Sequence, residues 1–208
     1  MDTLVRHLIK KRVLKTPRII EAFKAIDRKD FVTDEYKDMA YEDTPLSIGE
    51  NQTISQPHTV AFMLELLEPK PGNKIMDVGS GSGWQTTLLA YIVSRSDTGR
   101  IFAIELIPEL KKFGDKNISK YNFIKKGLVT TLQMSAENGI SQEAPFDRII
   151  AGASAKKLPG AWKEQLAPNG RIVMPIKNSI WRFIKNADGS LQEEEYPGFV
   201  FVPFVVES

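Results

Sequence analysis

Apolar residues in the first part of the chain recur at helical spacing in two segments. After Pro17, a favoured first-turn residue, the apolar positions of residues 18–26 predict an amphipathic helix (Ile19, Ile20, Phe23 and Ile26). Residues 41–57 are rich in Pro, Gly, Ser, Thr and Asn and show no sustained period, which favours an ordered loop. A second helix is predicted over residues 57–67, where apolar residues dominate again.

From Lys74 onward short apolar runs alternate with segments of helical length. Such alternation predicts a mostly parallel sheet with helices on both faces, because parallel neighbours are joined by a crossover that is usually a helix. We therefore expect a doubly wound α/β fold. The five runs that we interpret as strands are Ile75–Val78, Ile101–Ile104, Val129–Met134, Arg148–Ala151 and Arg171–Met174.

The pattern after Pro175 becomes strand-like. Ile180–Ile184 and Phe199–Val206 are apolar runs separated by a turn signal at Asp188 and Gly189. We interpret both runs as antiparallel strands at one edge of the same sheet. The chain is then one domain, 1–208, with a helical cover and active-site segment (1–70), a cofactor-binding core (71–176) and C-terminal strands (177–208).

Composition narrows the classes of function. The chain has 208 residues, of which 26% are charged and 42% hydrophobic, and a formal net charge of +2 that is far below the excess of a dedicated nucleic-acid binder. It has no cysteine and only two histidines, His7 and His58, which excludes disulfides and disfavours a zinc site. No secretory signal or membrane-spanning run is evident. We expect a cytoplasmic monomer that binds neither nucleic acid nor membrane.

A glycine-rich turn carries the candidate chemistry. The predicted strand that ends at Asp77-Val78 runs into Gly79-Ser80-Gly81-Ser82-Gly83, and a helix over Trp84–Val93 follows. Glycine at such a turn lets the backbone approach a ligand closely. Glu105 lies about 20 positions further on, at the end of the next strand, where a carboxylate can accept hydrogen bonds from ribose hydroxyls. This order predicts a nucleoside site.

The spacing of the glycines separates two classes of cofactor. A dinucleotide fingerprint needs Gly or Ala at the position that Trp84 occupies. The acidic Asp77 would repel a diphosphate but suits the cationic amino group of an amino-acid cofactor. We therefore favour S-adenosylmethionine over a nicotinamide or flavin dinucleotide.

The chain also resembles a known family along nearly its whole length. Tyr41-Glu42-Asp43-Thr44-Pro45-Leu46-Ser47-Ile48-Gly49 and Gln52-Thr53-Ile54-Ser55-Gln56-Pro57-His58 resemble the signature segment of the protein-L-isoaspartate O-methyltransferases. Ala144-Pro145-Phe146-Asp147, Leu158-Pro159 and Phe201-Val202-Pro203 match later landmarks in the same order. The resemblance implies a Rossmann-like methyltransferase fold and methyl transfer from S-adenosylmethionine to the α-carboxylate of isoaspartyl residues. The implied partners are damaged proteins or peptides, and the implied role is their repair.

The resemblance makes Ser55 our candidate catalytic residue, because a hydroxyl can orient a carboxylate without reacting. From the residues alone, a cap for the helix that begins at Pro57 is the preferred role of Ser55; the resemblance reverses that preference, and the two roles can coexist. The family match and the glycine turn together give the expected cofactor-binding residues: Thr53, His58, Asp77, Gly79, Ser80, Gly81, Gly83, Glu105, Ser135 and Ala136.

Some positions depart from the family pattern. Met134-Ser135 stands where many members carry Gly-Asp, so Ser135 or Ala136 would offer adenine only a neutral or backbone contact. Trp84 replaces the commoner tyrosine, and Lys177 replaces the usual glycine. Two alternatives therefore stay open: a module that binds the cofactor with little turnover, and a methyltransferase with a small-molecule or nucleic-acid acceptor.

Overall fold

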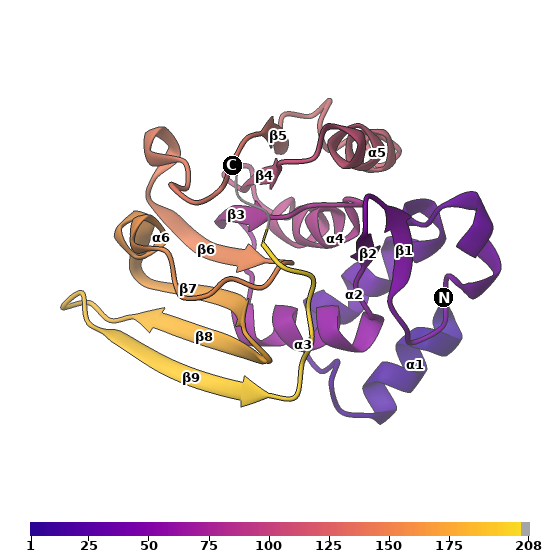
Figure 1. Ribbon diagram of the computed structural model, residues 1–208, viewed down its shortest axis with the longest axis horizontal. Helices are drawn as coiled ribbons and strands as arrows, with labels where there is room; N and C mark the ends of the chain where they lie inside the picture. Colours follow the sequence, from indigo (N-terminus) through magenta and orange to yellow (C-terminus); the bar gives the residue numbers. More distant parts are fainter. Residues whose placement is uncertain (205–208) are drawn as a thin grey trace.

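A seven-stranded sheet forms the centre of the protein in the computed structural model, which describes residues 1–204 (Figure 1). The strand order is β5-β4-β3-β6-β7-β8-β9; the first five strands of this order run parallel, and β8 and β9 are antiparallel to their neighbours. The predicted α/β fold is therefore confirmed. The strands are β3 (Lys74–Val78), β4 (Arg100–Glu105), β5 (Val129–Gln133), β6 (Phe146–Ala151), β7 (Leu166–Ile176), β8 (Ser179–Lys185) and β9 (Leu191–Pro197).

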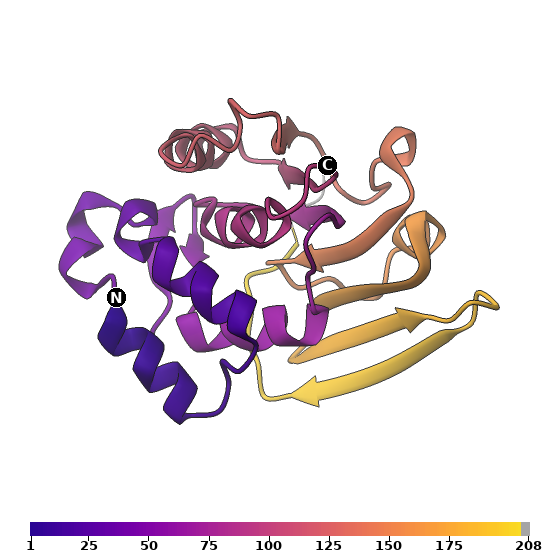
Figure 2. The same ribbon diagram turned by 180° about the vertical axis from the view of Figure 1, so that it is seen from behind.

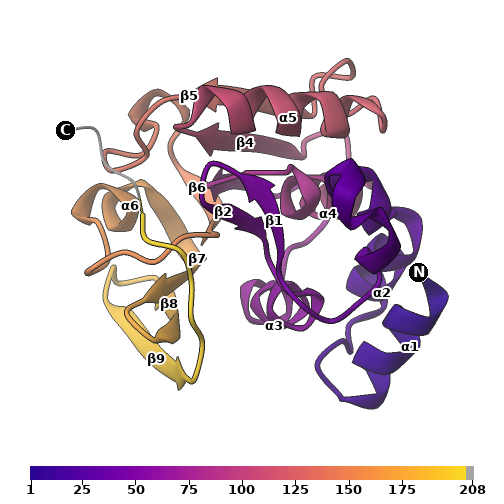
Figure 3. The same ribbon diagram turned by 45° about the vertical axis from the view of Figure 1, so that its right-hand side comes forward.

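Helices cover both faces of the sheet, as Figure 3 shows. On one face lie α3 (Pro57–Leu67), α4 (Trp84–Val93) and α5 (Pro108–Ser119), and on the other lies the short α6 (Gly160–Gln165). A hydrophobic core lies on each face of the sheet, and β3 contributes to both because side chains alternate along a strand. Ile75 packs with the first group of helices, whereas Met76 and Val78 pack with Trp162 of α6. This division explains why the central strands β3, β4 and β6 are largely apolar and buried.

The N-terminal helices form a further layer outside α3 and α4 (Figure 2). They are α1 (Asp2–Lys10) and α2 (Pro17–Ala25), followed by the 3₁₀ turns η1 (Arg28–Phe31) and η2 (Asp34–Met39). Phe23 of α2 meets Trp84 of α4 edge to face, with ring centroids 5.5 Å apart. Pro17 occupies the first turn of α2, as predicted.

The segment predicted as an ordered loop, residues 41–57, contains a small hairpin. Strands β1 (Leu46–Gly49) and β2 (Gln52–Ile54) pair antiparallel and form a separate two-stranded sheet. The turn between them places Glu50 and Asn51 in the left-handed region, with φ of 51° and 55°. The composition and the lack of a period favoured a loop, and Glu50, an unusual residue for such a turn, gave no hairpin signal.

The prediction of a strand over residues 199–206 was wrong for the described part of that range. Residues 199–204 form no strand, apart from an isolated bridge between Pro203 and Ser154, and residues 205 and 206 lie outside the described residues. The last strand within residues 1–204 is β9, whose Glu-rich sequence pairs with β8 across the Asp188-Gly189 turn. The turn of the hairpin fixes the pairing of β9 with β8, and a strand at the edge of a sheet tolerates charged side chains.

No helix within residues 1–204 is long and apolar enough to cross a membrane. Over the same residues, no three carboxylate or histidine side chains gather as a metal site would require.

Candidate cofactor and acceptor site

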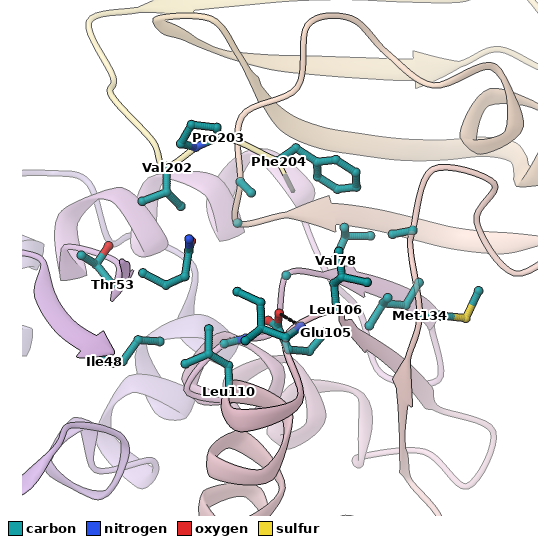
Figure 4. A pocket seen from close by; sticks show the side chains of 18 residues that line it. Ile48, Thr53, Val78, Glu105, Leu106, Leu110, Met134, Val202, Pro203 and Phe204 are labelled. Atoms are coloured by element: carbon teal, nitrogen blue, oxygen red, sulfur yellow. Dashed lines mark hydrogen bonds between the residues drawn. The ribbon is translucent and has the colours of Figure 1, made fainter. Parts of the chain in front are cut away.

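A cleft lies at the carboxyl ends of β3, β4 and β6 (Figure 4). The strand order reverses between β3 and β6, and open α/β sheets bind their ligands at such a reversal. Gly79 and Gly81 come from the loop after β3, Glu105 ends β4, and Gly152 follows β6. Two distant segments border the cleft: the β1–β2 hairpin lies at one side, and residues 202–204 lie above it.

The glycine loop is fixed by the backbone of the neighbouring strand. The amides of Gly79 and Ser80 both donate to the carbonyl of Ile104, at 2.9 and 3.1 Å. Gly79 and Gly81 line the cleft, and Ser80 lines a smaller hollow beside it. Gly83 faces the protein instead: a Cβ there would lie 2.7 Å from Cγ1 of Ile118 on α5. The first two glycines thus leave room for a ligand, and the third allows close packing.

Glu105 lies on the floor of the cleft and is 7% exposed. One carboxylate oxygen accepts from the amide of Gly81 at 2.9 Å and the other from the amide of Ile107 at 3.0 Å. These bonds orient a negative acceptor toward the cleft in a place of low dielectric. A pair of ribose hydroxyls is the group that such a carboxylate recognises at the end of this strand.

Asp77 lies beneath the loop and does not line the cleft. It is fully buried, and its two oxygens accept from Nε2 of Gln85 at 2.7 Å and from the hydroxyl of Thr86 at 2.6 Å. Burial raises the pKa of Asp77 to about 6; the hydrogen bonds from Thr86 and Gln85 oppose that rise, and the charge of Glu105 adds to it. In this structure Asp77 ties β3 to α4.

The wall beside β5 is apolar. Met134 and Ala136 line the cleft there, whereas Ser135 does not, and its hydroxyl accepts only a long 3.5 Å bond from the amide of Glu137. The carbonyl of Ala136 accepts from Nε1 of the buried Trp162 at 2.7 Å, which fixes this turn. The flat face of an aromatic ring such as a purine fits a wall of this chemistry.

A second hollow opens beside the cleft and is called here the acceptor hollow. It shares Thr53, Gly152 and Val202 with the cleft, and Ser55 lines it. None of its lining residues carries a charged side chain. They are Pro45, Thr53, Ser55, Gln56, Thr59, Gly152, Val200, Phe201 and Val202.

Ser55 does not cap α3, so the alternative interpretation of this residue was wrong. The N-cap of α3 is Gln56, and its side chain makes no capping bond to a backbone amide of the helix. The amide of His58 donates instead to Oδ1 of Asp43 at 2.8 Å, so a residue of the preceding loop satisfies the helix end. The half-buried Ser55 faces the hollows on either side of it.

Comparison with known proteins decides the family. A family model described as protein-L-isoaspartate(D-aspartate) O-methyltransferase matches residues 1–208. The chain belongs to this family. Two protein-L-isoaspartate O-methyltransferases among its relatives are 40% identical (Aeropyrum pernix, covering 98% of this chain and 78% of the relative) and 37% identical (Methanopyrus kandleri, covering 99% and 91%).

Solved structures agree on the fold. A Plasmodium falciparum protein assigned to the isoaspartate methyltransferases, crystallised with S-adenosyl-L-homocysteine, superposes with a TM-score of 0.88 at 24% identity, over 98% of this chain and 97% of that one. The Rossmann-like methyltransferase fold that the resemblance implied is therefore confirmed. The family uses S-adenosylmethionine, and the residues of the cleft fit its parts: a carboxylate for the ribose, glycines at the loop and an apolar wall.

His58, which was expected at the cofactor site, does not line the cleft of this isoaspartate methyltransferase, and neither do Asp77, Gly83 and Ser135. His58 lines a separate cavity with Arg12, Phe62 and Glu65, on the other side of α3 from the acceptor hollow. Thr53 and Ala136, by contrast, line the cleft as expected. A helix places successive residues about 100° apart, so His58 and Thr59 face different hollows.

Several lining residues of the cleft escaped the sequence analysis. Ile107 and Leu110 follow Glu105 and enter from the start of α5, and Ile48 enters from the hairpin. Val202 belongs to the closing family landmark, and its carbonyl accepts from the amide of Ser154 at 2.8 Å. The sequence did carry a signal for these residues: Ile107 and Leu110 lie close to Glu105 along the chain, and Val202 lies within the closing family landmark.

Proposed function

We propose that the protein transfers a methyl group from S-adenosylmethionine to the α-carboxylate of L-isoaspartyl residues in damaged proteins, the first step of their repair. The family match over residues 1–208 carries this proposal. The geometry supports it, because the acceptor hollow adjoins the cofactor cleft at Thr53 and Gly152. A group held in the hollow therefore lies beside a group held in the cleft.

The cofactor would be held by Glu105 at its ribose, by the backbone at Gly79 and Gly81, and by the apolar wall that includes Met134 and Ile107. When bound, it supplies a sulfonium methyl group that is already activated for transfer. The protein's own residues then have to bind, orient and exclude water.

The acceptor carboxylate is ionised at neutral pH, so the reaction needs no strong general base. Thr53 offers a hydroxyl group at the boundary of the cleft and the acceptor hollow, and Ser55 offers one in the acceptor hollow. Val202 and its neighbours cover the boundary from above and limit the access of water. Orientation of this kind contributes roughly 7 to 11 kcal/mol in favourable cases. We propose Ser55 as the residue that orients the carboxylate.

The test is methyl transfer from labelled S-adenosylmethionine to an isoaspartyl peptide and to its aspartyl twin. We expect selective labelling of the isoaspartyl peptide and a large loss of kcat in Ser55→Ala. Ser119→Ala, at an exposed position near the end of α5, is the matched control and should behave as wild type. Equal labelling of both peptides would reject the proposal.

A module that binds the cofactor without turnover is the second candidate. The absence of a polar side chain from the wall at Met134 and Ala136 is the observation that favours it. It predicts binding of S-adenosylhomocysteine with no methyl transfer to the isoaspartyl peptide. Measured turnover on that peptide would eliminate it.

We also propose that the protein acts as a monomer on polypeptides, because one chain supplies both the cofactor cleft and the acceptor hollow. Light scattering of the purified protein during turnover would test this. A mass of two chains in the active species would contradict it.

A further inference from the structure

Arg28 is a buried cation close behind the acceptor hollow. It begins η1, its side chain has no exposed surface, and its guanidinium carbon lies 5.2 Å from the centre of the Trp84 ring. Within residues 1–204 it forms no ion pair with a carboxylate. A buried charge without such a pair is destabilising, so Arg28 must be stabilised by other contacts or serve a function.

The guanidinium group donates to four backbone carbonyls. Nη1 bonds those of Ala40 and Glu42 at 2.9 and 3.2 Å, and Nη2 bonds those of Thr44 and Ser55 at 2.9 and 3.2 Å. A planar fork is suited to holding several oxygens in fixed directions, which the single ammonium of lysine does less well. Arg28 thus joins the loop before β1 to the peptide that carries the Ser55 side chain.

The charge of Arg28 also matters for the acceptor. The lining of the acceptor hollow includes no charged side chain, yet the group to be methylated is an anion. Burial lowers the pKa of Arg28 to about 10, partly offset by the charge of Asp43, so the guanidinium is cationic at neutral pH. Asp43 is itself close to Lys11, at 3.6 Å, which limits how far it cancels that charge.

We propose that Arg28 is a positioning residue for methyl transfer: it fixes the Ser55 peptide, and its buried charge makes the hollow prefer a carboxylate to a neutral group. The inference rests on the proposed function. Arg28 then determines the selectivity for an anionic acceptor although it does not touch the acceptor. In a low-dielectric surrounding such a charge acts across a peptide group.

The experiment compares binding of an isoaspartyl peptide with that of its isoasparaginyl analogue, in which a carboxamide replaces the α-carboxylate. S-adenosylhomocysteine is present, so no turnover occurs. Arg28→Met removes the charge, and Lys29→Met removes the same charge at the adjacent, exposed position. We expect the preference for the carboxylate to fall about tenfold in Arg28→Met, as for loss of a charge that acts on the acceptor without contact, and to stay unchanged in Lys29→Met. An unchanged preference in an Arg28→Met protein that still binds S-adenosylhomocysteine would overturn the proposal.

If Arg28→Met fails to fold, the variant Arg28→Lys tests the proposed role of Arg28. It keeps the charge but lacks the fork, so we expect the preference to be retained and kcat to fall about tenfold. Loss of the preference, or a kcat equal to that of wild type, would contradict the proposal. Failure of the proposed function has a different signature: wild type would not methylate the isoaspartyl peptide, whatever the binding ratios of the variants.

Discussion

Replacement of Gly83 by alanine tests the separation of roles within the glycine loop. Gly83 has a φ of +83° and is the N-cap of α4. The added Cβ would lie 2.7 Å from Cγ1 of the buried Ile118 and 3.1 Å from the carbonyl oxygen of Gly114. Since that carbonyl belongs to the helix α5, neither neighbour can move without shifting α5 or the loop.

The expected destabilisation has two parts. A left-handed backbone conformation costs an L-residue about 1–2 kcal/mol, and overpacking adds about 1–3 kcal/mol, giving roughly 2–5 kcal/mol in all. Gly127 is the matched control, because it has a φ of +68° but no atom within 4 Å of an added Cβ. Gly127→Ala should therefore lose only about 1–2 kcal/mol.

The assay is urea unfolding of the two variants and wild type, together with the affinity for S-adenosylhomocysteine. We expect Gly83→Ala to lose the larger unfolding free energy and also to bind the ligand more weakly, because Gly81 on the same loop lines the cleft. Gly127→Ala should bind normally. Equal destabilisation of the two variants would refute the view that Gly83 is required by its packing on α5.

Three further predictions concern carboxylates. In Glu105→Gln only one side-chain oxygen remains to accept from the amides of Gly81 and Ile107. The affinity for S-adenosylhomocysteine, measured by calorimetry, should therefore fall at least about tenfold. An unchanged affinity would contradict the role of Glu105. The folded pKa of Asp77, about 6, lies above its unfolded value of about 3.9, so the native state retains a proton that the unfolded state releases between these values. Relative to Asp77→Asn, the unfolding free energy of wild type should therefore fall by about 2 kcal/mol as the pH rises from 4 to 6, and parallel pH profiles would contradict this. Asp43→Ala removes the acceptor for the His58 amide and should lower the unfolding free energy by about 1 kcal/mol in urea unfolding; no loss would show that water satisfies the helix end equally well.

Local sequence patterns predicted the elements whose bounds are set by neighbouring residues. The predicted helices 57–67 and 84–93 agree with α3 and α4 at both ends, because proline begins the first and the glycine loop begins the second. The five predicted strands all occur, several with additional residues at their ends. Burial between two helical layers makes such strands continuously apolar, which is the signal that the sequence carries.

Pairing and packing between distant segments left no such signal. Residues 199–204 are apolar because they lie over other groups: Phe199 stacks on Phe62 of α3 with centroids 5.2 Å apart, and Phe204 meets Trp162 edge to face. Val200 in the same run is 87% exposed. Hydrophobicity alone does not separate a strand from a segment that crosses the surface of other elements.

The site was predictable to the same degree. Glu105 and the first glycines are placed by the strand-to-helix order, and the structure brings them together as expected. His58 was expected at the cleft from its nearness to Ser55 in sequence, but the helix turns it toward a different cavity. Arg28 gave no sign at all, since an isolated arginine in a polar stretch resembles a surface residue, and only the folded loop surrounds it with carbonyls.

The border of the cleft brings together segments that are far apart in the sequence, since Ile48 and Thr53 of the hairpin and Val202 line one space. Ribosomal synthesis delivers these segments at very different times, so an emerging chain can pair its central strands long before the ligand site closes. Removal of residues 199–204 should therefore leave a chain that collapses and forms much of its sheet but exposes the cleft to solvent. Ligand retention, rather than helix content, is then the sensitive reporter of complete folding for this protein.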